Sequence, residues 1–410
     1  MAGFLMLCMA TSSYALIAKR LSSTILTAPI LFICLGTAFA VGGLVSPETG
    51  EALLHPVTEV ALVVLLFLDA AQTDLSALRK RSLWPRRMLL IGLPLSVVFG
   101  TLAGLVFFPH WSLATIALAA AILTPTDAAL GQAVVSNEAV PIRERRALTV
   151  ESGLNDGLAL PLILLFAALV TAAEAQNSVD WLIFGAKQIL LGPLAGIAVG
   201  ALGGWALLRA KAAGSTSEIY EGVGALCLAG SAYLAAVLIG GNGFIAAFAA
   251  GLVFGAIVKD ACSFIFEFTE SEGQLLVWAS FFLLGVTLVP EAIAHLTLPM
   301  LGLILVSLFV IRPLAIWLSL SRTDAPPITR MFFGWFGPRG LATALFALLV
   351  VEQLPHQLGE TILHLAINAV WMSAILHGVT AAPGARWYAD KTKGMKSPQD
   401  SNQGDFEKEI

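Results

Sequence analysis

The chain has 410 residues, of which 58% are hydrophobic and 12% are charged, and its formal net charge is -4. This composition, with a mean hydropathy of +0.85, is typical of a protein embedded in a lipid bilayer and excludes an ordinary soluble domain. The small net charge and the confinement of Lys and Arg to a few loops exclude the basic surface that nucleic acid binding requires.

Apolar runs of about 20 residues, the length that crosses a bilayer as a helix, recur along the whole chain. We predict about thirteen transmembrane helices, at 2–18, 23–45, 53–72, 88–108, 112–135, 147–173, 181–208, 218–239, 241–258, 274–290, 297–320, 329–351 and 360–381. The separation at 240–243 fits either a turn or a kink. The predicted fold is an all-α polytopic membrane protein. Residues 1–387 form one transmembrane domain, and 388–410 form a short cytoplasmic tail whose polar composition predicts disorder.

Lys and Arg residues alternate between loops in the way that sets membrane orientation. Twenty of the 23 follow odd-numbered helices or lie in the tail, and the loops after even-numbered helices contain none. These residues are Lys19, Arg20, Arg79, Lys80, Arg81, Arg86, Arg87, Arg143, Arg145, Arg146, Arg209, Lys211, Lys259, Arg322, Arg330, Arg386, Lys391, Lys393, Lys396 and Lys408. The pattern predicts an N-terminus outside and a C-terminus in the cytoplasm. Because no Lys or Arg precedes the first apolar run, we interpret that run as an uncleaved span and not as a signal peptide.

Thirteen helices allow an internal repeat, in which helices 1–6 and 8–13 form two six-helix units of opposite orientation and helix 7 links them. Inverted repeats with helices that break near the bilayer midplane recur in secondary transporters. The fifth helix of each unit has a proline beside a charge, Pro125 with Asp127 and Pro338 with Arg339. Because proline removes a helical hydrogen bond, we predict that both helices unwind there and expose carbonyl groups that can coordinate a cation. A packing kink in each helix is the alternative.

Ionisable residues inside the hydrocarbon region are costly, so each is a candidate functional residue. The sixth predicted helix contains Glu151, Ser152, Asn155 and Asp156 within two turns. Asp156 would lie about 14 Å from the cytoplasmic end of this helix, close to the midplane, and Asp127 of the fifth helix reaches a similar depth. We predict that these acids converge on one site.

Arg339 also falls near the midplane and requires a carboxylate partner, because its guanidinium group keeps its charge. Glu151 is the predicted partner. One positive charge does not neutralise three acids, so at least one acid is left to bind a cation or a proton. A carboxylate that holds either a proton or a hard cation couples the movements of the two. The sequence has no Gly-rich phosphate loop followed by Lys and Ser or Thr, which argues against a pump driven by a nucleotide.

The remaining charges in apolar segments have weaker interpretations. Asp69 is either an interfacial charge or a gate to a cytoplasmic funnel, and Lys187 and Arg312 are membrane anchors or structural ion pairs. Five histidines fall at or near the predicted outer ends of helices, where solvated interfacial residues are expected, and receive no role: His55, His110, His295, His356 and His364. His377 lies within the last helix and receives no role either.

Four segments in a fixed order carry a resemblance to a known family. They are TPTDAAL at 124–130, ESGLNDG at 151–157, GNGFIAAFAAGLVFG at 241–255 and GPRG at 337–340, with HGVTAAP at 377–383 as further support. With these segments the chain resembles the cation:proton antiporter-1 family, which groups bacterial NhaP-type sodium/proton antiporters with eukaryotic sodium/hydrogen exchangers. The resemblance implies exchange of Na⁺, or Li⁺, for H⁺ by alternating access, without a cofactor, and a role in pH homeostasis. It also implies a homodimer with dimer and core domains in a bacterial inner membrane.

The resemblance assigns roles to particular residues. It implies that Asp156 carries the ion or proton and that Ser152, Thr126 and Asp127 help to coordinate Na⁺, with Asn155 beside them. Electroneutral exchange is implied because an Asn-Asp pair stands where electrogenic relatives have Asp-Asp. Glu151 and Arg339 match the structural ion pair of the family.

The chain departs from the family pattern at two of the predicted sites. Ala128 follows Asp127 where the family commonly has Pro, which leaves the local unwinding open. Asp69 and Ala70 stand where the family often has Glu-Gly, which leaves the role of that site open.

Two alternatives remain open on the sequence. Exchange of K⁺ for H⁺ by the same mechanism is one, because selectivity depends on the size of the cavity. The other is an intramembrane aspartyl hydrolase, for which Asp127 and Asp156 would be the paired acids.

Overall fold

The computed structural model of the chain describes residues 2–21, 27–45, 47–73, 83–135, 137, 139–174, 178–258 and 263–392. Every regular element in these ranges is a helix, and none of them contains a strand. By length and composition, seven of the described helices could cross a bilayer, and six shorter apolar helices accompany them. The predicted all-α class is therefore confirmed.

Each of the thirteen predicted ranges overlaps at least one helix of the structure, so the order and type of the elements are confirmed. The number of bilayer crossings stays a prediction. The N-terminal part of the chain forms α1 (Ala2–Leu21), α2 (Ala28–Val41), α3 (Pro47–Gln72), α5 (Leu83–Arg87), the π-helix η1 (Met88–Gly92), α6 (Leu93–Phe107), α7 (Leu113–Ile122), α8 (Ala128–Val135) and α9 (Ile142–Glu174). The remainder forms α10 (Ser178–Ala212), α11 (Glu218–Leu238), α12 (Gly243–Val258), α13 (Ser263–Thr287), α14 (Val289–Ala294), α15 (Leu298–Val306), the π-helix η2 (Ser307–Ile311), α16 (Arg312–Ser319), α17 (Pro327–Trp335), α18 (Leu341–Val351) and α19 (His356–Thr392).

Several predictions fall wholly or partly outside the described ranges. Residues 388–392 of the predicted tail belong to α19, and the rest of the tail, 393–410, lies outside the described residues. The same holds for four of the basic loop residues, Arg79, Lys80, Arg81 and Lys259. The orientation in the membrane therefore stays a prediction.

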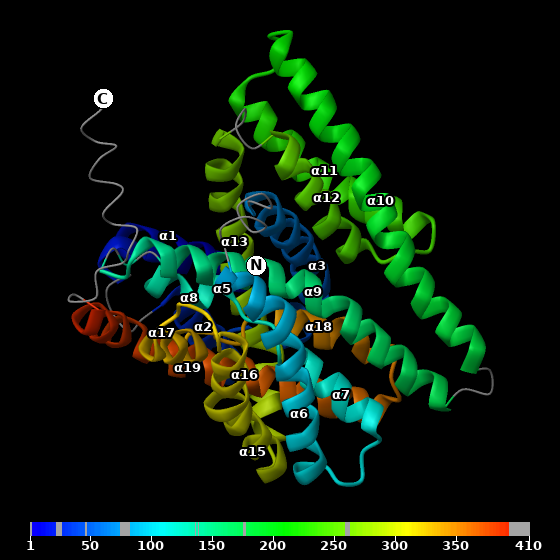
Figure 1. Cartoon of the computed structure of the whole chain (residues 1–410), viewed down its shortest axis with the longest axis vertical. Helices are drawn as coiled ribbons and strands as arrows, with labels where there is room; N and C mark the ends of the chain where they lie inside the picture. The colour runs from blue at the N-terminus through cyan, green and yellow to red at the C-terminus, as the bar shows by residue number, and fades with distance from the viewer. Residues whose placement is uncertain are drawn as a thin grey trace.

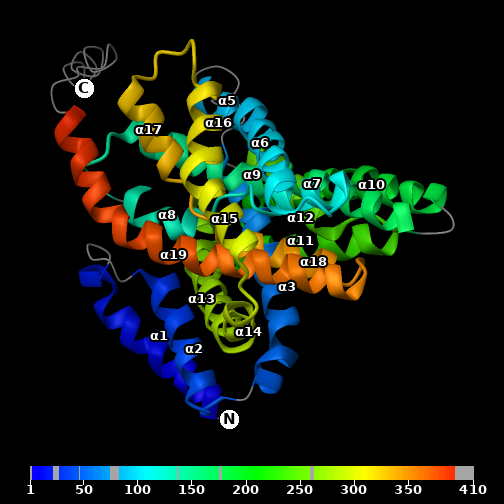
Figure 2. The same cartoon turned by 90° about the horizontal axis from the view of Figure 1, so that it is seen from below.

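The helices form several groups in space. α10, α11 and α12 lie together toward one end of the long axis, whereas α6 and α15 lie at the other end (Figure 1). α19 runs across the molecule with α1 and α2 on one side and α16 and α17 on the other (Figure 2). It also packs against α7, α8, α17 and α18, so one long helix supports all four of the short helices beside the predicted breaks.

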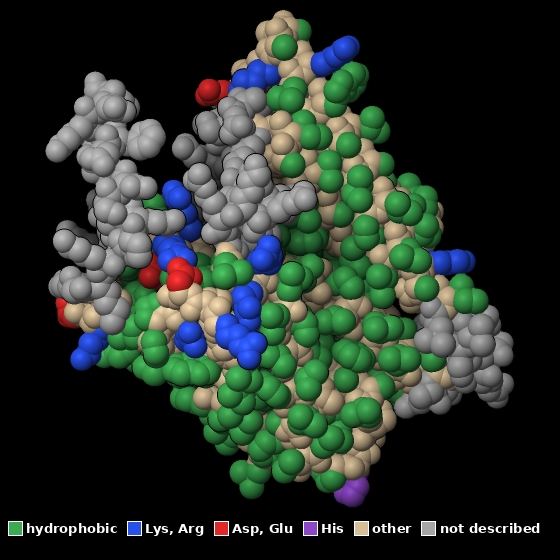
Figure 3. Space-filling model, viewed as in Figure 1, with side chains coloured by type: hydrophobic (Ala, Val, Ile, Leu, Met, Phe, Trp, Pro, Cys, Tyr) green, Lys and Arg blue, Asp and Glu red, His purple; other side chains and the backbone are tan. Residues whose placement is uncertain are grey.

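Much of the outer surface of the molecule is apolar. Leu16, Val106 and Leu238 are 88%, 77% and 86% exposed, and hydrophobic side chains cover much of the face shown in Figure 3. Lipid tails are as apolar as these side chains, so such exposure costs nothing in a bilayer, whereas it would be unfavourable in water. Together with the apolar helices, this surface defines a polytopic membrane protein.

Both helices that were predicted to unwind are broken. α7 ends at Ile122 and α8 begins at Ala128, and likewise α17 ends at Trp335 and α18 begins at Leu341. Pro125 and Pro338 lie in the two non-helical segments, where the missing N–H group prevents helical hydrogen bonding from continuing. The predicted unwinding is confirmed, and the alternative of a kink in a continuous helix is wrong.

The helices that precede the two breaks share a second irregularity. Residues 83–107 run through α5, η1 and α6, and residues 298–319 run through α15, η2 and α16. A proline at the second position of the next helix, Pro94 or Pro313, follows each π-helical turn. η1 packs against α16, and η2 packs against α6, which is the reciprocal contact that a two-fold relation produces. These matched features agree with the predicted inverted repeat.

α12 packs closely against α10 and α3 because small residues line its contacts. A Cβ atom on Gly196 of α10 would lie 2.2 Å from the carbonyl oxygen of Ala246, and one on Gly251 of α12 would lie 2.1 Å from that of Phe67. Small residues allow helices in membranes to approach to backbone contact. This contact fixes α3, which carries Asp69 toward the centre of the molecule.

The segment between α11 and α12 is a turn. Gly240 has a φ of +80°, a backbone conformation that glycine adopts without steric cost. Asn242 then caps α12, because its Oδ1 accepts a hydrogen bond of 3.0 Å from the backbone N–H of Ile245. Of the two alternatives at 240–243, the kink is therefore wrong.

Candidate functional site

The two unwound segments cross and hydrogen-bond to one another. The backbone N–H of Asp127 donates to the carbonyl of Pro338 at 2.9 Å. In return, the backbone N–H of Leu341 donates to Oδ2 of Asp127 at 2.7 Å. Nη1 of Arg339 donates to the carbonyl of Thr124 at 3.0 Å. Polar backbone groups that the breaks release are thus satisfied across the crossing.

Two charges at the crossing lie against helix ends of opposite sign. Asp127 immediately precedes α8 and caps the first residue of α18, so its carboxylate lies at the positive ends of both helices. The Arg339 guanidinium lies beside the carbonyls of Thr124 and Pro125, which follow α7, at 3.0 and 3.4 Å. Partial charges at helix ends stabilise such side chains. The Asp127 and Arg339 charges are therefore matched largely by the backbone.

The buried ion pair differs from the prediction, because Glu151 pairs with Arg312 and not with Arg339. Nη1 and Nη2 of Arg312 donate to Oε1 and Oε2 of Glu151 at 3.0 and 3.1 Å. Both side chains are 5% exposed, and this two-bond geometry is the strong form of an Arg–carboxylate contact. Gly337 makes room for it, since a Cβ there would lie 1.6 Å from Nε of Arg312. Arg339 does not pair with Glu151 because its guanidinium group donates instead to the carbonyl of Thr124, just after the C-terminal end of α7. Of the two roles considered for Arg312, membrane anchoring is wrong and structural pairing is confirmed.

The predicted polar residues of α9 meet the unwound segment before α8. The Ser152 hydroxyl donates to the carbonyl of Thr126 at 2.7 Å, and Nδ2 of Asn155 donates to Oγ1 of Thr126. The Thr126 hydroxyl in turn lies 3.5 Å from Oε2 of Glu151. All four residues are buried. The structure thus brings Thr126, Ser152, Asn155 and Glu151 into one network, and whether any of them touches an ion stays a prediction.

Asp156 lies near the middle of α9, next to this network. Its Oδ1 atom is buried without a hydrogen-bond donor, as is Oδ1 of Asn155. The carboxylates of Asp127, Asp69 and Glu151 are close enough to interact electrostatically with Asp156. A buried acceptor without a donor costs on the order of 1–3 kcal/mol. A proton on the carboxyl group or a cation beside it would remove that cost.

Asp69 lies on α3 where this helix contacts α9. A Cβ atom on Gly153 would lie 3.2 Å from Cβ of Asp69, so the glycine lets the two helices approach closely. The side chain is partly buried, and the backbone carbonyl of Asp69 accepts a hydrogen bond of 2.9 Å from Thr73. This position beside Asp156 favours the gate over the interfacial charge, and the gate stays a prediction.

Acids outnumber basic residues at the crossing. The group contains four carboxylates and two guanidinium groups, from Asp69, Asp127, Glu151, Asp156, Arg312 and Arg339. Glu151 is paired with Arg312, and helix ends match Asp127 and Arg339. Uncompensated charge in a low-dielectric interior is unfavourable. Compensation by a proton or a cation is therefore most needed at Asp156, whose Oδ1 atom has no hydrogen-bond donor.

Sequence reasoning placed none of three further residues in the site. Arg312 immediately precedes Pro313 in an apolar span, which was its only signal. Ser373 and His377 of α19 hold the second break: Oγ of Ser373 accepts a 2.7 Å hydrogen bond from the backbone N–H of Arg339. Nε2 of His377 lies 2.9 Å from the carbonyl of Trp335. The HGVTAAP segment was the signal for His377.

Fold and site together define a class, the polytopic membrane proteins in which two broken helices cross beside buried carboxylates. Residues 5–387 match the model of one protein family, which is described as "Sodium/hydrogen exchanger, transmembrane". The chain belongs to this sodium/hydrogen exchanger family, which confirms the resemblance found in the sequence.

Individual relatives agree with this membership. The chain is 29% identical over 382 residues to the K(+)/H(+) antiporter NhaP of Alkalimonas amylolytica, covering 91% of this chain and 64% of that protein. It is 28% identical over 371 residues to the K(+)/H(+) antiporter NhaP2 of Shewanella sp. (strain ANA-3), covering 87% and 62%. The chain therefore spans less than two thirds of the length of these curated relatives.

A solved structure shows the same fold. The sodium proton antiporter MjNhaP1 from Methanocaldococcus jannaschii superposes with a TM-score of 0.77 and 19% sequence identity, covering 96% of this chain and 99% of that chain. At this identity the likeness concerns the fold alone.

Proposed function

We propose that this protein is a secondary transporter that exchanges Na⁺ for H⁺ by alternating access. The observation that carries the proposal is the buried Oδ1 atom of Asp156, a carboxylate oxygen without a donor, in a group with an excess of acids. A carboxylate in this position binds a proton or a hard cation, and binding of one displaces the other. If the site changes its exposure only when occupied, the two movements are coupled.

The other residues of the site have separate roles in this mechanism. The Asn155 Oδ1 atom, also without a donor, supplies a second oxygen toward the cation. Ser152 and Thr126 hold the unwound segment against α9 through the 2.7 Å hydrogen bond, so their backbone and hydroxyl oxygens border the site. Asp127 keeps α8 and α18 in place and adds negative charge. Glu151 and Arg312 neutralise one another in a buried ion pair next to these residues.

Membrane placement and assembly belong to the same proposal. The Lys and Arg residues of the loops support an N-terminus outside and a C-terminus in the cytoplasm of a bacterial inner membrane. Competition of one cation with protons at one principal carboxylate supports electroneutral exchange. The exposed apolar surface leaves room for the proposed homodimer. That the protein is no enzyme and needs no cofactor stays a prediction.

The test is exchange in proteoliposomes with an imposed pH gradient. Asp156→Asn keeps the shape of the side chain but removes the titratable charge, so cation-driven proton movement should fall to that of protein-free liposomes. Asp324→Asn makes the same chemical change in a loop outside the site and should retain exchange. Equal thermal unfolding of the Asp156→Asn variant and the wild type in detergent shows that it folds. Wild-type exchange rates in the Asp156→Asn variant would refute the proposal.

Exchange of K⁺ is the second candidate, because the relatives at 29% and 28% identity are both named K(+)/H(+) antiporters. The measurement is the same assay in equal concentrations of Na⁺, Li⁺ and K⁺ chloride. Dissipation of the gradient by Na⁺ and Li⁺ supports the primary proposal. Dissipation by K⁺ alone would replace Na⁺ with K⁺ while leaving the role of Asp156 intact.

A further inference from the structure

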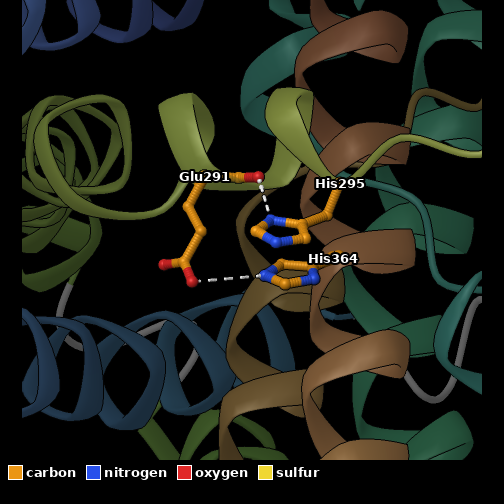
Figure 4. A group of neighbouring side chains, drawn as sticks. All are labelled: Glu291, His295 and His364. Carbon is orange, nitrogen blue, oxygen red and sulfur yellow. Dashed lines mark hydrogen bonds and ion pairs between the residues drawn. The ribbon is translucent and has the colours of Figure 1, made fainter.

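A second group of chemically reactive side chains lies apart from the crossing. Glu291 belongs to α14, His295 is the residue that ends this helix, and His364 lies about two turns into α19. The carboxylate oxygen and the ring nitrogens that they offer all lie within 4.8 Å of one another. Figure 4 shows the two imidazole rings stacked and the Glu291 carboxylate beside them. The exchange mechanism uses none of the three.

The hydrogen bonds of the group leave ring nitrogens available as ligands. Nδ1 of His295 lies 3.0 Å from the backbone carbonyl of Glu291 and donates to it, so Nε2 keeps its lone pair. Nε2 of His364 faces Oε1 of Glu291 at 3.8 Å. The two rings lie 4.7 Å apart between centroids and are nearly parallel, at 6°. The hydrogen bond from Nδ1 of His295 to a backbone carbonyl is of the kind that orients metal-ligating histidines.

The backbone beneath the group is fixed. Asn368 of α19 is fully buried, and its Nδ2 donates to the carbonyl of Ala292 in α14 at 2.6 Å and to that of His364 at 2.9 Å. One amide group thus clamps α14 to the turn of α19 that carries His364. Ligand groups on clamped backbone lose little freedom when a metal binds.

We propose that Glu291, His295 and His364 bind a divalent transition-metal ion of the Zn²⁺ type. Two imidazoles and one carboxylate are a ligand set that suits such ions. Tetrahedral ligands at Zn²⁺ bond lengths lie about 3.4 Å apart. The ligand atoms lie up to 4.8 Å apart, so the exposed Glu291 and His295 side chains must close on the ion. The His295 ring must also turn out of its stack with His364, because the lone pair of an imidazole nitrogen lies in the plane of the ring. Na⁺ and K⁺ prefer oxygen ligands, so the group is no second site for the transported cation.

A metal at this position would join two helices that share α2 as a neighbour and otherwise pack against different helices. α14 follows α13, which packs against α2 and α3, whereas α19 packs against the halves of both broken helices. Glu291 and His295 belong to α14 and its C-terminal end, and His364 belongs to α19. The bound ion would therefore tie α14 and its neighbours to the helix that holds the ion site.

The test is calorimetric titration of the purified, tag-free, full-length chain in detergent with Zn²⁺ alone, after removal of metals by a chelator. We expect one Zn²⁺ per chain. His295→Ala and His364→Ala should each weaken the affinity at least about 10-fold, because even the loss of an outer partner of a ligand costs roughly 10- to 100-fold. His356→Ala is the matched control and should leave the affinity unchanged. His356 is also an exposed histidine, 3.4 Å from a carboxylate of Glu360, but no third ligand joins it among the described residues.

A second variant protects the test against misfolding. Glu291 is exposed, and Glu291→Gln keeps its shape, so its unfolding temperature without metal should equal that of the wild type. Zn²⁺ should raise the unfolding temperature of the wild type and not of Glu291→Gln, whereas Mg²⁺ should raise neither. Identical Zn²⁺ titrations for the wild type and the histidine variants would overturn the proposal. Because binding is measured without transport, this result is independent of the exchange assay.

Discussion

Arg312 balances a carboxylate that the interior would otherwise hold without compensation. Its side chain and that of Glu151 are each 5% exposed. Removal of one partner from a buried pair is far costlier than removal of both, because a lone buried charge loses its solvation and its attraction together. We expect Arg312→Met to lower the free energy of unfolding by about 3–5 kcal/mol. Denaturant unfolding in detergent measures this change.

Two further variants separate charge balance from side-chain packing. Arg312→Met combined with Glu151→Gln should regain most of the lost stability, because neither charge remains. Lys187→Met removes a positive charge from an exposed position on α10 and should leave stability within about 0.5 kcal/mol of the wild type. Equal losses in the single and the double variant would contradict the ion-pair interpretation.

The choice of partner for Glu151 shows what the sequence does not contain. Arg312 and Arg339 both fall inside apolar spans, so depth in the membrane does not distinguish them. The decision depends on how the broken halves turn, because Arg339 hydrogen-bonds to the carbonyl of Thr124 only once α7 has ended. The hydrophobic lengths and the two prolines are local signals, and they sufficed for the elements and their breaks. The pairing of Glu151 with Arg312 depends on tertiary structure, which local sequence signals do not contain. The same holds for the proximity of His295 and His364.

At the scale of the elements, the crossing of the two breaks depends on the lack of a side chain at Gly340. A Cβ atom there would lie 1.9 Å from Oδ2 of Asp127, the atom that caps α18. We expect Gly340→Ala to displace Asp127, to lower the free energy of unfolding by about 1–3 kcal/mol as overpacking does, and to abolish exchange. Gly230→Ala in α11 is the control, since its Cβ would meet nothing within 4 Å. Full exchange by Gly340→Ala would show that the crossing tolerates displacement.

The loop between α16 and α17 makes a separate contact with α5 and α9. Asp324, between α16 and α17, accepts hydrogen bonds from Trp84 of α5 at 2.7 Å and from Arg143 of α9 at 2.6 Å. Partial burial alone would raise the pKa of Asp324, but the hydrogen bonds and the charge of Arg143 outweigh it, so the pKa lies below its usual value of 3.8. The contact joins helices from both halves of the chain.

The lowered pKa of Asp324 gives a stability effect with a defined sign. A carboxylate whose pKa is lower in the folded state stabilises the fold above the unfolded pKa, and this stabilisation is lost as the pH falls through the folded pKa. We expect Asp324→Asn to lower stability at neutral pH by less than about 1 kcal/mol, because the pair is partly exposed. Thermal unfolding across pH should show a constant deficit above about pH 4 that shrinks toward zero in more acidic buffer. A deficit that grows with acidity would contradict this assignment.

At the scale of the whole molecule, α19 connects the two sites. His364, near its start, belongs to the proposed metal group, and Ser373 and His377, two to four turns further on, hold the second broken helix through the backbone of Arg339 and Trp335. Alternating access requires one bundle of helices to move against the other around the ion site. Asn368 already holds α14 to α19 in this arrangement, and a metal bound by both helices would add to that contact and favour this arrangement over any in which the two helices separate.

Zn²⁺ should therefore slow exchange, and it should act from one side of the membrane only. At a concentration 100 times its dissociation constant, a ligand that binds one arrangement stabilises it by about 2.7 kcal/mol, which corresponds to roughly a 100-fold bias. The measurement is exchange in vesicles of known orientation, with Zn²⁺ on one side and an impermeant chelator on the other. The predicted orientation places His364 outside, so outer Zn²⁺ should inhibit, inner Zn²⁺ should not, and His364→Ala should exchange at an unchanged rate with either. Equal inhibition of the wild type and His364→Ala would separate Zn²⁺ binding from transport.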